Sequence, residues 1–499
     1  MTKQYQFWFA TGSQDLYGQE CLEKVANHAR AIVEGLNEGA NLPFEIVWKP
    51  TLLDSGTIRR LFCEANEDER CAGVITWMHT FSPAKSWIAG LQQCQKPLLH
   101  LHTQFHENIP YDTIDMDFMN ENQSAHGDRE YGHMVTRLDM ERKVIVGHWK
   151  RKQVQEQIAS WMRTAIGVVE SKNIRIVRVA DNMRNVAVTE GDKVEAQIKF
   201  GWEIDAYPVN EIVEYVEGVS KSDINQLVEE YYTKYDILLE GRDEREFREH
   251  VAVQAQIELG FEQFLKEKNY QGIVTHFGDL GKLKQLPGLA IQRLMEKGYG
   301  FGGEGDWKTA AMVRLMKVMT MSMKDRKGTS FMEDYTYHLE EGKEGILQAH
   351  MLEVCPSIAD SKIGIKVNPL SMGQREDPAR LVFSSKVGNG IATSLIDLGN
   401  RFRLIIQEVE CKKLEKEMPK LPVAHGYWIP KPNFEIGCAS WILAGGAHHT
   451  AFTYDLTAEQ MVDWADMMGI ESIVIGKDTT IKNLKNELKW NSLYYMLRR

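Results

Sequence analysis

Side chains of the types that hold a divalent metal ion gather in the C-terminal half of this chain. Two carboxylate oxygens and two imidazole nitrogens suit a fairly hard ion such as Mn²⁺ better than structural zinc, which favours thiolates. Such an ion acts as a Lewis acid on a small oxygenated substrate. We interpret the set as a candidate metal centre. Its members are Glu304, Glu333, His350 and one histidine of the pair His448 and His449.

Glu333 and His350 flank a turn-like segment. If residues 341–342 are the two central turn residues of a hairpin, Glu333 pairs with His350. Directly opposed residues have Cβ atoms roughly 5 Å apart, close enough to share a cation. Phe331 and Tyr335 should then share the face of Glu333, because strand side chains repeat every two residues. The alternative is an ordinary surface pair, since a shift of one residue separates the faces.

The other two candidates lie beside small residues. Glu304 is flanked by glycines, which permit a backbone that aims its carboxylate inward, although a solvated loop acid is the plainer interpretation. Asp306 is a candidate cap for the helix that follows. His448 and His449 would point to opposite faces of an extended strand, so that only one reaches a given site. One core and one surface histidine is the alternative.

Three further segments carry polar groups at the ends of expected strands. The histidines of residues 100–106 follow a strand whose apolar pattern predicts burial. We favour a role in the wall of a polar pocket, or in a hydrogen-bonded network of the core, over a metal-binding motif. Gln14 lies in a loop that lacks the lysine and glycine spacing of a phosphate loop, and it suits hydroxyl groups. Residues 181–184 either face a cleft or cap a helix.

Composition narrows the class of protein. The 499 residues carry a net charge of −11, which argues against a nucleic-acid partner. Seven scattered cysteines without a CxxC pair indicate a reduced, cytoplasmic protein, and we see neither a signal peptide nor a membrane-length apolar run. We expect no membrane partner.

The elements that must position these groups alternate between strand and helix in the first two thirds of the chain. This pattern predicts an α/β protein with two Rossmann-like, parallel-sheet domains. Beyond residue 328, clusters of branched residues between turns predict a β-rich, barrel-like C-terminal domain with terminal helices. We expect domains at residues 1–172, 173–327 and 328–499.

Longer segments resemble one known family, L-arabinose isomerase, from near residue 7 to Arg499. Long shared segments spread over a whole chain are far more specific than a single short motif. The segments are residues 9–18, 79–85, 115–120, 181–184, 303–309, 330–335, 350–357 and 444–450.

The resemblance implies a metal-dependent aldose–ketose isomerase that converts L-arabinose to L-ribulose, with D-galactose to D-tagatose as a side activity. It implies Mn²⁺ as the usual cofactor, with Co²⁺ as an alternative and no organic cofactor. It also implies homohexamers built as a dimer of trimers. The metal ligands would be Glu304, Glu333, His350 and His449, and the same two glutamates would form the acid/base pair.

The resemblance also implies a substrate pocket. Its residues would be Gln14, Leu16, Met183, Phe277, Phe331, Met351 and Met372. His126, in a polar loop, is our candidate for a residue that reaches across from a neighbouring subunit. Met372 stands where the family often has isoleucine, and residues 362–374 match the family pattern only loosely. If His448 and His449 lie in an extended segment, His448 should point away from the metal that His449 binds.

Two other functions compete with this one. A non-catalytic sugar-binding protein would also have two α/β domains around a cleft, because a fold does not fix a function. A nicotinamide oxidoreductase would need a dinucleotide fingerprint, which the glycine run at residues 298–305 matches only formally. The sequence also leaves open which glutamate is the carbon base, and whether the hydrogen moves as a proton or a hydride.

Overall fold

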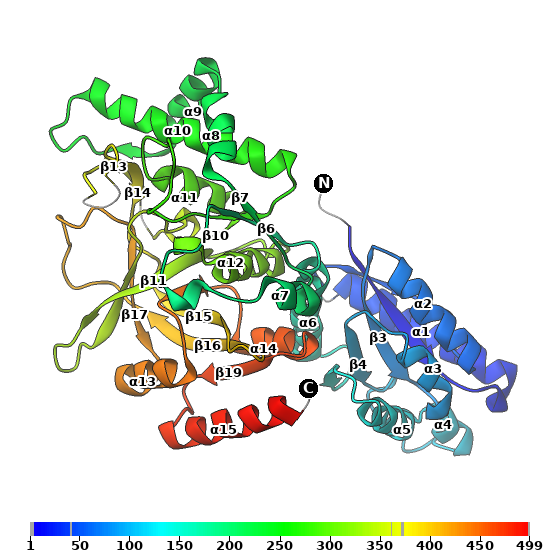
Figure 1. The fold of residues 1–499 in the computed structure, drawn as a ribbon. Coiled ribbons are helices and arrows are strands. Elements are labelled where there is room, and N and C mark those ends of the chain that lie inside the picture. The colour runs from blue at the N-terminus through cyan, green and yellow to red at the C-terminus, as the bar shows by residue number, and fades with distance from the viewer. Residues whose placement is uncertain (1–3, 40–41, 361, 371–373, 498–499) are drawn as a thin grey trace. The chain divides into compact units, whose positions relative to one another are not determined.

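Short strands and helices alternate along the first part of the chain (Figure 1). The computed structural model describes residues 4–39, 42–360, 362–370 and 374–497. Within it the chain divides into two compact units, Met1–Val169 and Glu170–Arg499.

The first unit contains a five-stranded parallel sheet of order β2-β1-β3-β4-β5. Every residue of β3 is buried, as expected for a parallel strand covered on both faces. The strands are β1 (Gln6–Gly12), β2 (Glu45–Trp48), β3 (Cys71–Met78), β4 (Leu98–His102) and β5 (Lys143–Val146). The helices are α1 (Gly18–Gly39), α2 (Ser55–Glu67), α3 (Ile88–Leu91), α4 (Met116–Glu121), α5 (Ser124–Arg137) and α6 (Lys152–Ser171), which runs on past the unit boundary.

The second unit begins with a four-stranded parallel sheet of order β10-β9-β6-β7. Its strands are β6 (Arg175–Val179), β7 (Glu203–Tyr207), β9 (Gly272–Val274) and β10 (Gly300–Gly302). The helices of this region are α7 (Lys193–Phe200), α8 (Val209–Glu217), α9 (Lys221–Lys234), α10 (Glu244–Glu267), α11 (Gly288–Glu296) and α12 (Trp307–Met319).

The remaining strands form a largely antiparallel sheet that closes on itself. Its order is β15-β18-β11-β12-β17-β16-β19, and a further pairing of β15 with β16 closes the strands from β15 to β16 into a barrel, to which β19 adds beside β16. The strands are β11 (Thr329–His338), β12 (Gly345–Ala349), β15 (Gly388–Asp397), β16 (Phe402–Cys411), β17 (His425–Pro430), β18 (His449–Thr453) and β19 (Glu471–Ile475). The last helices are α13 (Phe434–Ala444), α14 (Ala458–Met467) and α15 (Ile481–Leu497).

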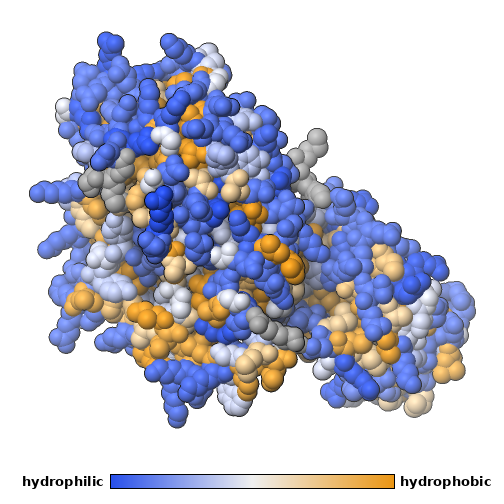
Figure 2. Space-filling model, in the orientation of Figure 1, coloured by the Kyte–Doolittle hydropathy of each residue, from blue (hydrophilic) through white to orange (hydrophobic). Residues whose placement is uncertain are grey.

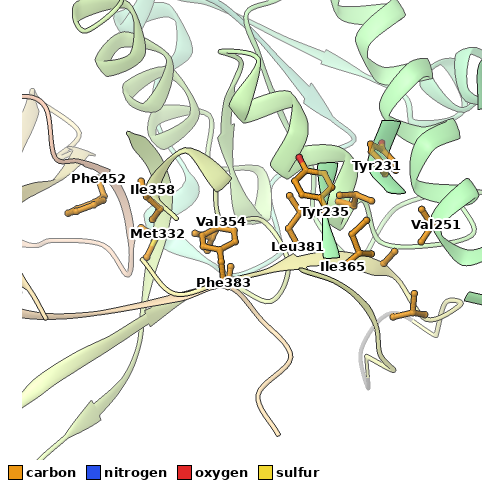
Figure 3. Close-up of a cluster of buried hydrophobic side chains, with 14 of the residues drawn as sticks. Tyr231, Tyr235, Val251, Met332, Val354, Ile358, Ile365, Leu381, Phe383 and Phe452 are labelled. Carbon is orange, nitrogen blue, oxygen red and sulfur yellow. The ribbon is translucent and has the colours of Figure 1, made fainter. Parts of the chain in front are cut away.

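One hydrophobic cluster joins the parts of the second unit. It contains Tyr231 of α9 and Val251 of α10, and it continues to Met332 of β11 and Phe452 of β18 (Figure 3). A small three-stranded sheet contributes Ile365 and Leu381 to the same cluster, and its strands are β8 (Asp236–Ile237), β13 (Gly364–Val367) and β14 (Ala379–Val382). The helices and the barrel therefore share a core, which fixes the loops above the parallel sheet against the barrel strands.

The predicted fold class is confirmed, because parallel α/β sheets precede a β-rich barrel. Not every strand beyond residue 328 belongs to the barrel, because β13 and β14 form a separate three-stranded sheet with β8. Among the described residues, no helix combines the length and the apolar character needed to cross a bilayer.

Candidate functional site

Glu304 sits in a strained turn directly after β10. Its φ of 58° and ψ of 22° are left-handed values that a non-glycine residue adopts at a cost. Its neighbours leave no room for side chains: a Cβ on Gly303 would lie 3.0 Å from Nε2 of His350, and one on Gly305 would lie 2.7 Å from Cα of Asn182. The glycines therefore let the backbone pass close to the surrounding groups while it presents the Glu304 carboxylate.

Loops from neighbouring strands hold this turn. The backbone N–H of Met183, after β6, donates to the carbonyl of Glu304 at 2.9 Å, and that of Gly305 donates to the carbonyl of Thr275, after β9, at 3.2 Å. The carboxyl ends of β6, β9 and β10 thus meet, at the edge where parallel α/β sheets place ligands. A narrow pocket opens there, and Glu304 and His350 are among its lining residues.

The hairpin of β11 and β12 brings in the second carboxylate, with one correction to the predicted register. Its turn is centred on residues 341–342 as predicted, since Lys343 N–H donates to Glu340 O at 2.9 Å. A register shift between Asp334 and Thr336, however, pairs Glu333 with Ala349 and not with His350. A bulge of this kind adds one residue to one strand only.

The carboxylate of Glu333 still reaches His350. Its Oε2 lies 3.8 Å from Nε2 of His350, which follows the last residue of β12. Phe331 is buried and its ring lies 4.9 Å from that of His350. Tyr335 lies at the register shift and is half exposed, so the predicted alternation does not extend to it.

The histidine pair also differs from prediction. Nε2 of His448 lies 3.4 Å from Oε2 of Glu304, and Nε2 of His449 lies 3.9 Å from the same oxygen. The prediction that His448 points away is therefore wrong. The reason is that β18 begins at His449, so His448 occupies a bend where the alternation of a strand does not apply.

His350 and His449 are each held by a carboxylate on the Nδ1 atom. His350 pairs with Glu353, and His449 lies 3.2 Å from Oδ2 of Asp306. In both rings Nε2 is therefore the atom that faces the glutamates. Carboxylate partners of this kind fix the ring orientation of metal-binding histidines. Sequence reasoning missed this role of Asp306 and Glu353, although Glu353 lies only three residues from His350.

Two facing atoms of the site have no hydrogen-bond partner among the described residues: Oε2 of Glu304 and Nε2 of His449. An unpaired buried polar atom is costly, and a cation between the two would satisfy both. Glu304, His448 and His449 also offer ligand atoms within 4.8 Å of one another. The donor set, oxygen and imidazole nitrogen, fits a divalent ion of intermediate hardness.

The surroundings shift the pKa values of the carboxyl groups in this region in opposite directions. The imidazole of His448, whose Nε2 lies 3.4 Å from Oε2 of Glu304, is the main cause that lowers the pKa of Glu304. Burial alone would raise the pKa of Asp306, but Lys308 and His449 hold it well below its usual range. Asp334, beside Glu333, is the opposite case, because burial raises its pKa to about 6.

The predicted substrate residues fall into three groups. Phe277 and Met351 line the pocket with Glu304, while Met183 lies in the loop that binds the Glu304 backbone. Met372 lies outside the described residues. The third group belongs to the first unit: Gln14, the largely exposed Leu16, and His126, whose ring packs 4.7 Å from that of Phe81.

Two histidine clusters of the first unit also have metal-ligand composition, namely His28, His79 and Glu121, and His100, His102 and Asp128. Each is already hydrogen-bonded. Nδ1 of His28 lies 2.7 Å from Nε2 of His79, and Nδ1 of His102 lies 2.7 Å from Oδ2 of the buried Asp128. The polar network that we favour over a metal site at residues 100–106 stays a prediction.

Comparisons with known proteins point to one family along the whole chain. Models described as the N-terminal, central and C-terminal domains of L-arabinose isomerase match residues 1–173, 175–322 and 328–471. L-arabinose isomerase of Geobacillus stearothermophilus is 57% identical over 491 residues, which is 98% of each chain. That of Bacillus subtilis (strain 168) is 53% identical over 498 residues, covering 100% of this chain and 99% of the relative. This chain belongs to the L-arabinose isomerase family.

Proposed function

We propose that this protein is a metal-dependent aldose–ketose isomerase that converts L-arabinose to L-ribulose. Full-length relatives that carry the name L-arabinose isomerase support the substrate. The observation that carries the metal dependence is a pair of buried atoms without a hydrogen bond to any described residue, Oε2 of Glu304 and Nε2 of His449, which lie 3.9 Å apart.

We assign Glu304, Glu333, His350 and His449 as the metal ligands. Mn²⁺ is the expected ion, with Co²⁺ as an alternative, and no organic cofactor is required. When bound, such an ion polarises the sugar oxygens and stabilises the negative charge that develops on them. The carboxylates Glu353 and Asp306 orient the two histidines through their Nδ1 atoms, so that their Nε2 atoms face the site.

The chemical difficulty is the weak acidity of a C–H bond next to a carbonyl. One carboxylate of the pair Glu304 and Glu333 takes the proton from C2 and returns it to C1, through an enediol or enediolate. The other transfers the proton between the oxygens on C1 and C2. Lowering of the Glu304 pKa by His448 keeps that carboxylate ionised, which suits a base. A hydride shift between C2 and C1 would use the same ligands.

The pocket accounts for the substrate class. Its lining residues include Glu304, Glu353, His276 and His350, and apolar residues such as Phe277 and Met351 form much of the remaining wall. A few polar groups in an otherwise apolar pocket suit a small neutral ligand, because they fix its orientation. D-galactose, which is longer by one hydroxymethyl carbon, should be a slower substrate and give D-tagatose.

We further propose that the protein assembles as a homohexamer, a dimer of trimers, with His126 completing the pocket of a neighbouring subunit. Apolar side chains gather on the surface around α13 (Figure 2), where Ile442 is 70% exposed, and Trp490 of α15 is 70% exposed as well. Exposed apolar patches of this kind mark protein–protein interfaces.

The activity is tested by incubating the Mn²⁺-loaded protein with L-arabinose in D₂O and following the sugar by NMR. L-ribulose should form, and deuterium should enter at C1 if a carboxylate carries the proton and exchanges it with solvent. A ketose that forms without any deuterium would support the hydride shift. The absence of ketose would leave the competing function, a sugar-binding protein without catalysis.

A further inference from the structure

His276 follows β9 and lines the same pocket as Glu304 and His350. Its Nδ1 atom is buried and makes no hydrogen bond to any described residue. Apart from Glu304, it is the only described lining residue that has such an atom. The cost of leaving a buried polar atom unpaired suggests that a ligand supplies the missing partner.

The ring is a neutral hydrogen-bonding group. Burial lowers its pKa below the ordinary histidine value, an effect that outweighs the nearby acids Asp279, Asp181 and Glu304. A neutral imidazole has one donor and one acceptor nitrogen, so it can either accept from or donate to a hydroxyl group. A Cβ on Gly278 would lie 3.2 Å from Nδ1, so the glycine leaves the space beside this nitrogen free.

The rest of the pocket gives a sugar few other partners. Five of the lining residues, Leu286, Pro287, Phe301, Leu352 and Leu370, offer no side-chain polar group, and Thr275 adds one hydroxyl. Glu353 is already engaged with Nδ1 of His350. A pentose carries an oxygen on every carbon, and an unpaired hydroxyl in an apolar wall weakens binding.

We propose that His276 is a specificity-determining residue that hydrogen-bonds a hydroxyl on C3, C4 or C5 of the sugar, away from the carbons that react. The assignment rests on the proposed function, since it places C1 and C2 at Glu304 and Glu333. His276 holds the unreactive end of an acyclic sugar against the apolar wall. It contributes to binding and not to the proton transfer itself.

The experiment compares His276→Leu, which removes the hydrogen-bonding group, with His276→Asn, which keeps a neutral donor and acceptor. Binding is measured by calorimetry with L-arabitol, which has no carbonyl and cannot react. We expect His276→Leu to weaken L-arabitol binding and raise KM for L-arabinose by about 3- to 10-fold, the worth of one neutral hydrogen bond. His276→Asn should recover part of this loss. The exposed His338 supplies the control, and His338→Leu should leave both constants unchanged.

Deoxy sugars identify the hydroxyl. If His276 binds one hydroxyl, the deoxy analogue lacking it should lose affinity for the wild type but lose little more in His276→Leu, because the two changes remove the same interaction. The inference is overturned if the affinity lost with each of the 3-, 4- and 5-deoxy analogues is as large in His276→Leu as in the wild type. Weakened Mn²⁺ binding in His276→Leu would also overturn it. Failure of the wild type to form ketose while these binding effects persist would instead overturn the proposed function alone.

Discussion

Oδ2 of Asp306 lies 3.2 Å from Nδ1 of His449, and the same carboxyl group caps α12 by accepting from the N–H of Thr309. One side chain therefore fixes both the start of the helix after Glu304 and the ring of a proposed metal ligand. The two functions can be separated, because asparagine caps helices about as well as aspartate but carries no charge.

Asp306→Asn should weaken Mn²⁺ binding by roughly 10- to 100-fold, the range seen when the partner of a ligand histidine is changed. Titration calorimetry measures this directly. The matched control is Asp192→Asn at the N-terminus of α7, where the aspartate accepts from the N–H groups of Val194 and Glu195. Equal Mn²⁺ affinities in the Asp306 variant and the control would show that Asp306 is only a helix cap.

Glu304→Gln and Glu333→Gln each keep the side-chain size but remove a base and a ligand charge. Each variant should lose about 10²- to 10⁴-fold in kcat/KM, the usual contribution of general acid–base catalysis. The double variant should lose little more, because residues that act as one unit are not additive. Near-normal turnover in either single variant would remove that glutamate from the catalytic pair.

His448 and His449 should have different roles although both lie near Glu304. His449→Leu should abolish tight Mn²⁺ binding, whereas His448→Leu should retain most of it. Loss of His448 removes the main cause that lowers the Glu304 pKa, so that this pKa rises. The acid limb of the kcat/KM profile should then move to higher pH in His448→Leu. An unmoved acid limb would contradict the effect of His448 on the Glu304 pKa, and a reversal of the two metal affinities would assign His448 and not His449 as the ligand.

A pH-dependent contribution to stability is expected in the first unit. The hydrogen bond to Asp128 raises the pKa of His102 above its ordinary value of 6.5. A group whose pKa is raised by folding stabilises the fold below the unfolded-state pKa, and this contribution disappears as the pH rises through the folded-state value. His102→Gln should therefore lower the free energy of unfolding more at pH 6 than at pH 9. Denaturant titrations at the two pH values test this, and an equal loss at both would contradict it.

The sequence predicted the elements well where apolar periodicity was strong, and the site less well where single residues decide the geometry. The turn at residues 341–342 follows from its residue types, but nothing in the sequence marks the register shift beside Tyr335 that pairs Glu333 with Ala349. The alternation rule misplaced His448 because the rule assumes a strand, and the strand begins one residue later.

The site itself depends on contacts between segments far apart in the chain. The glycines around Glu304 indicated a special backbone, and the left-handed φ of 58° bears this out. The contact of Asp306 with His449 joins residues 143 positions apart. Such a contact appears only when the loop after β10 and the start of β18 have been brought together by the shared core of the second unit.

The most direct test of the account is the metal dependence of turnover. Protein stripped of divalent ions by exhaustive chelation should form no L-ribulose from L-arabinose, and stoichiometric Mn²⁺ should restore the activity. Glu304→Gln, treated in the same way, should not recover. Undiminished ketose formation by the metal-free protein would contradict the proposed site of Glu304, Glu333, His350 and His449.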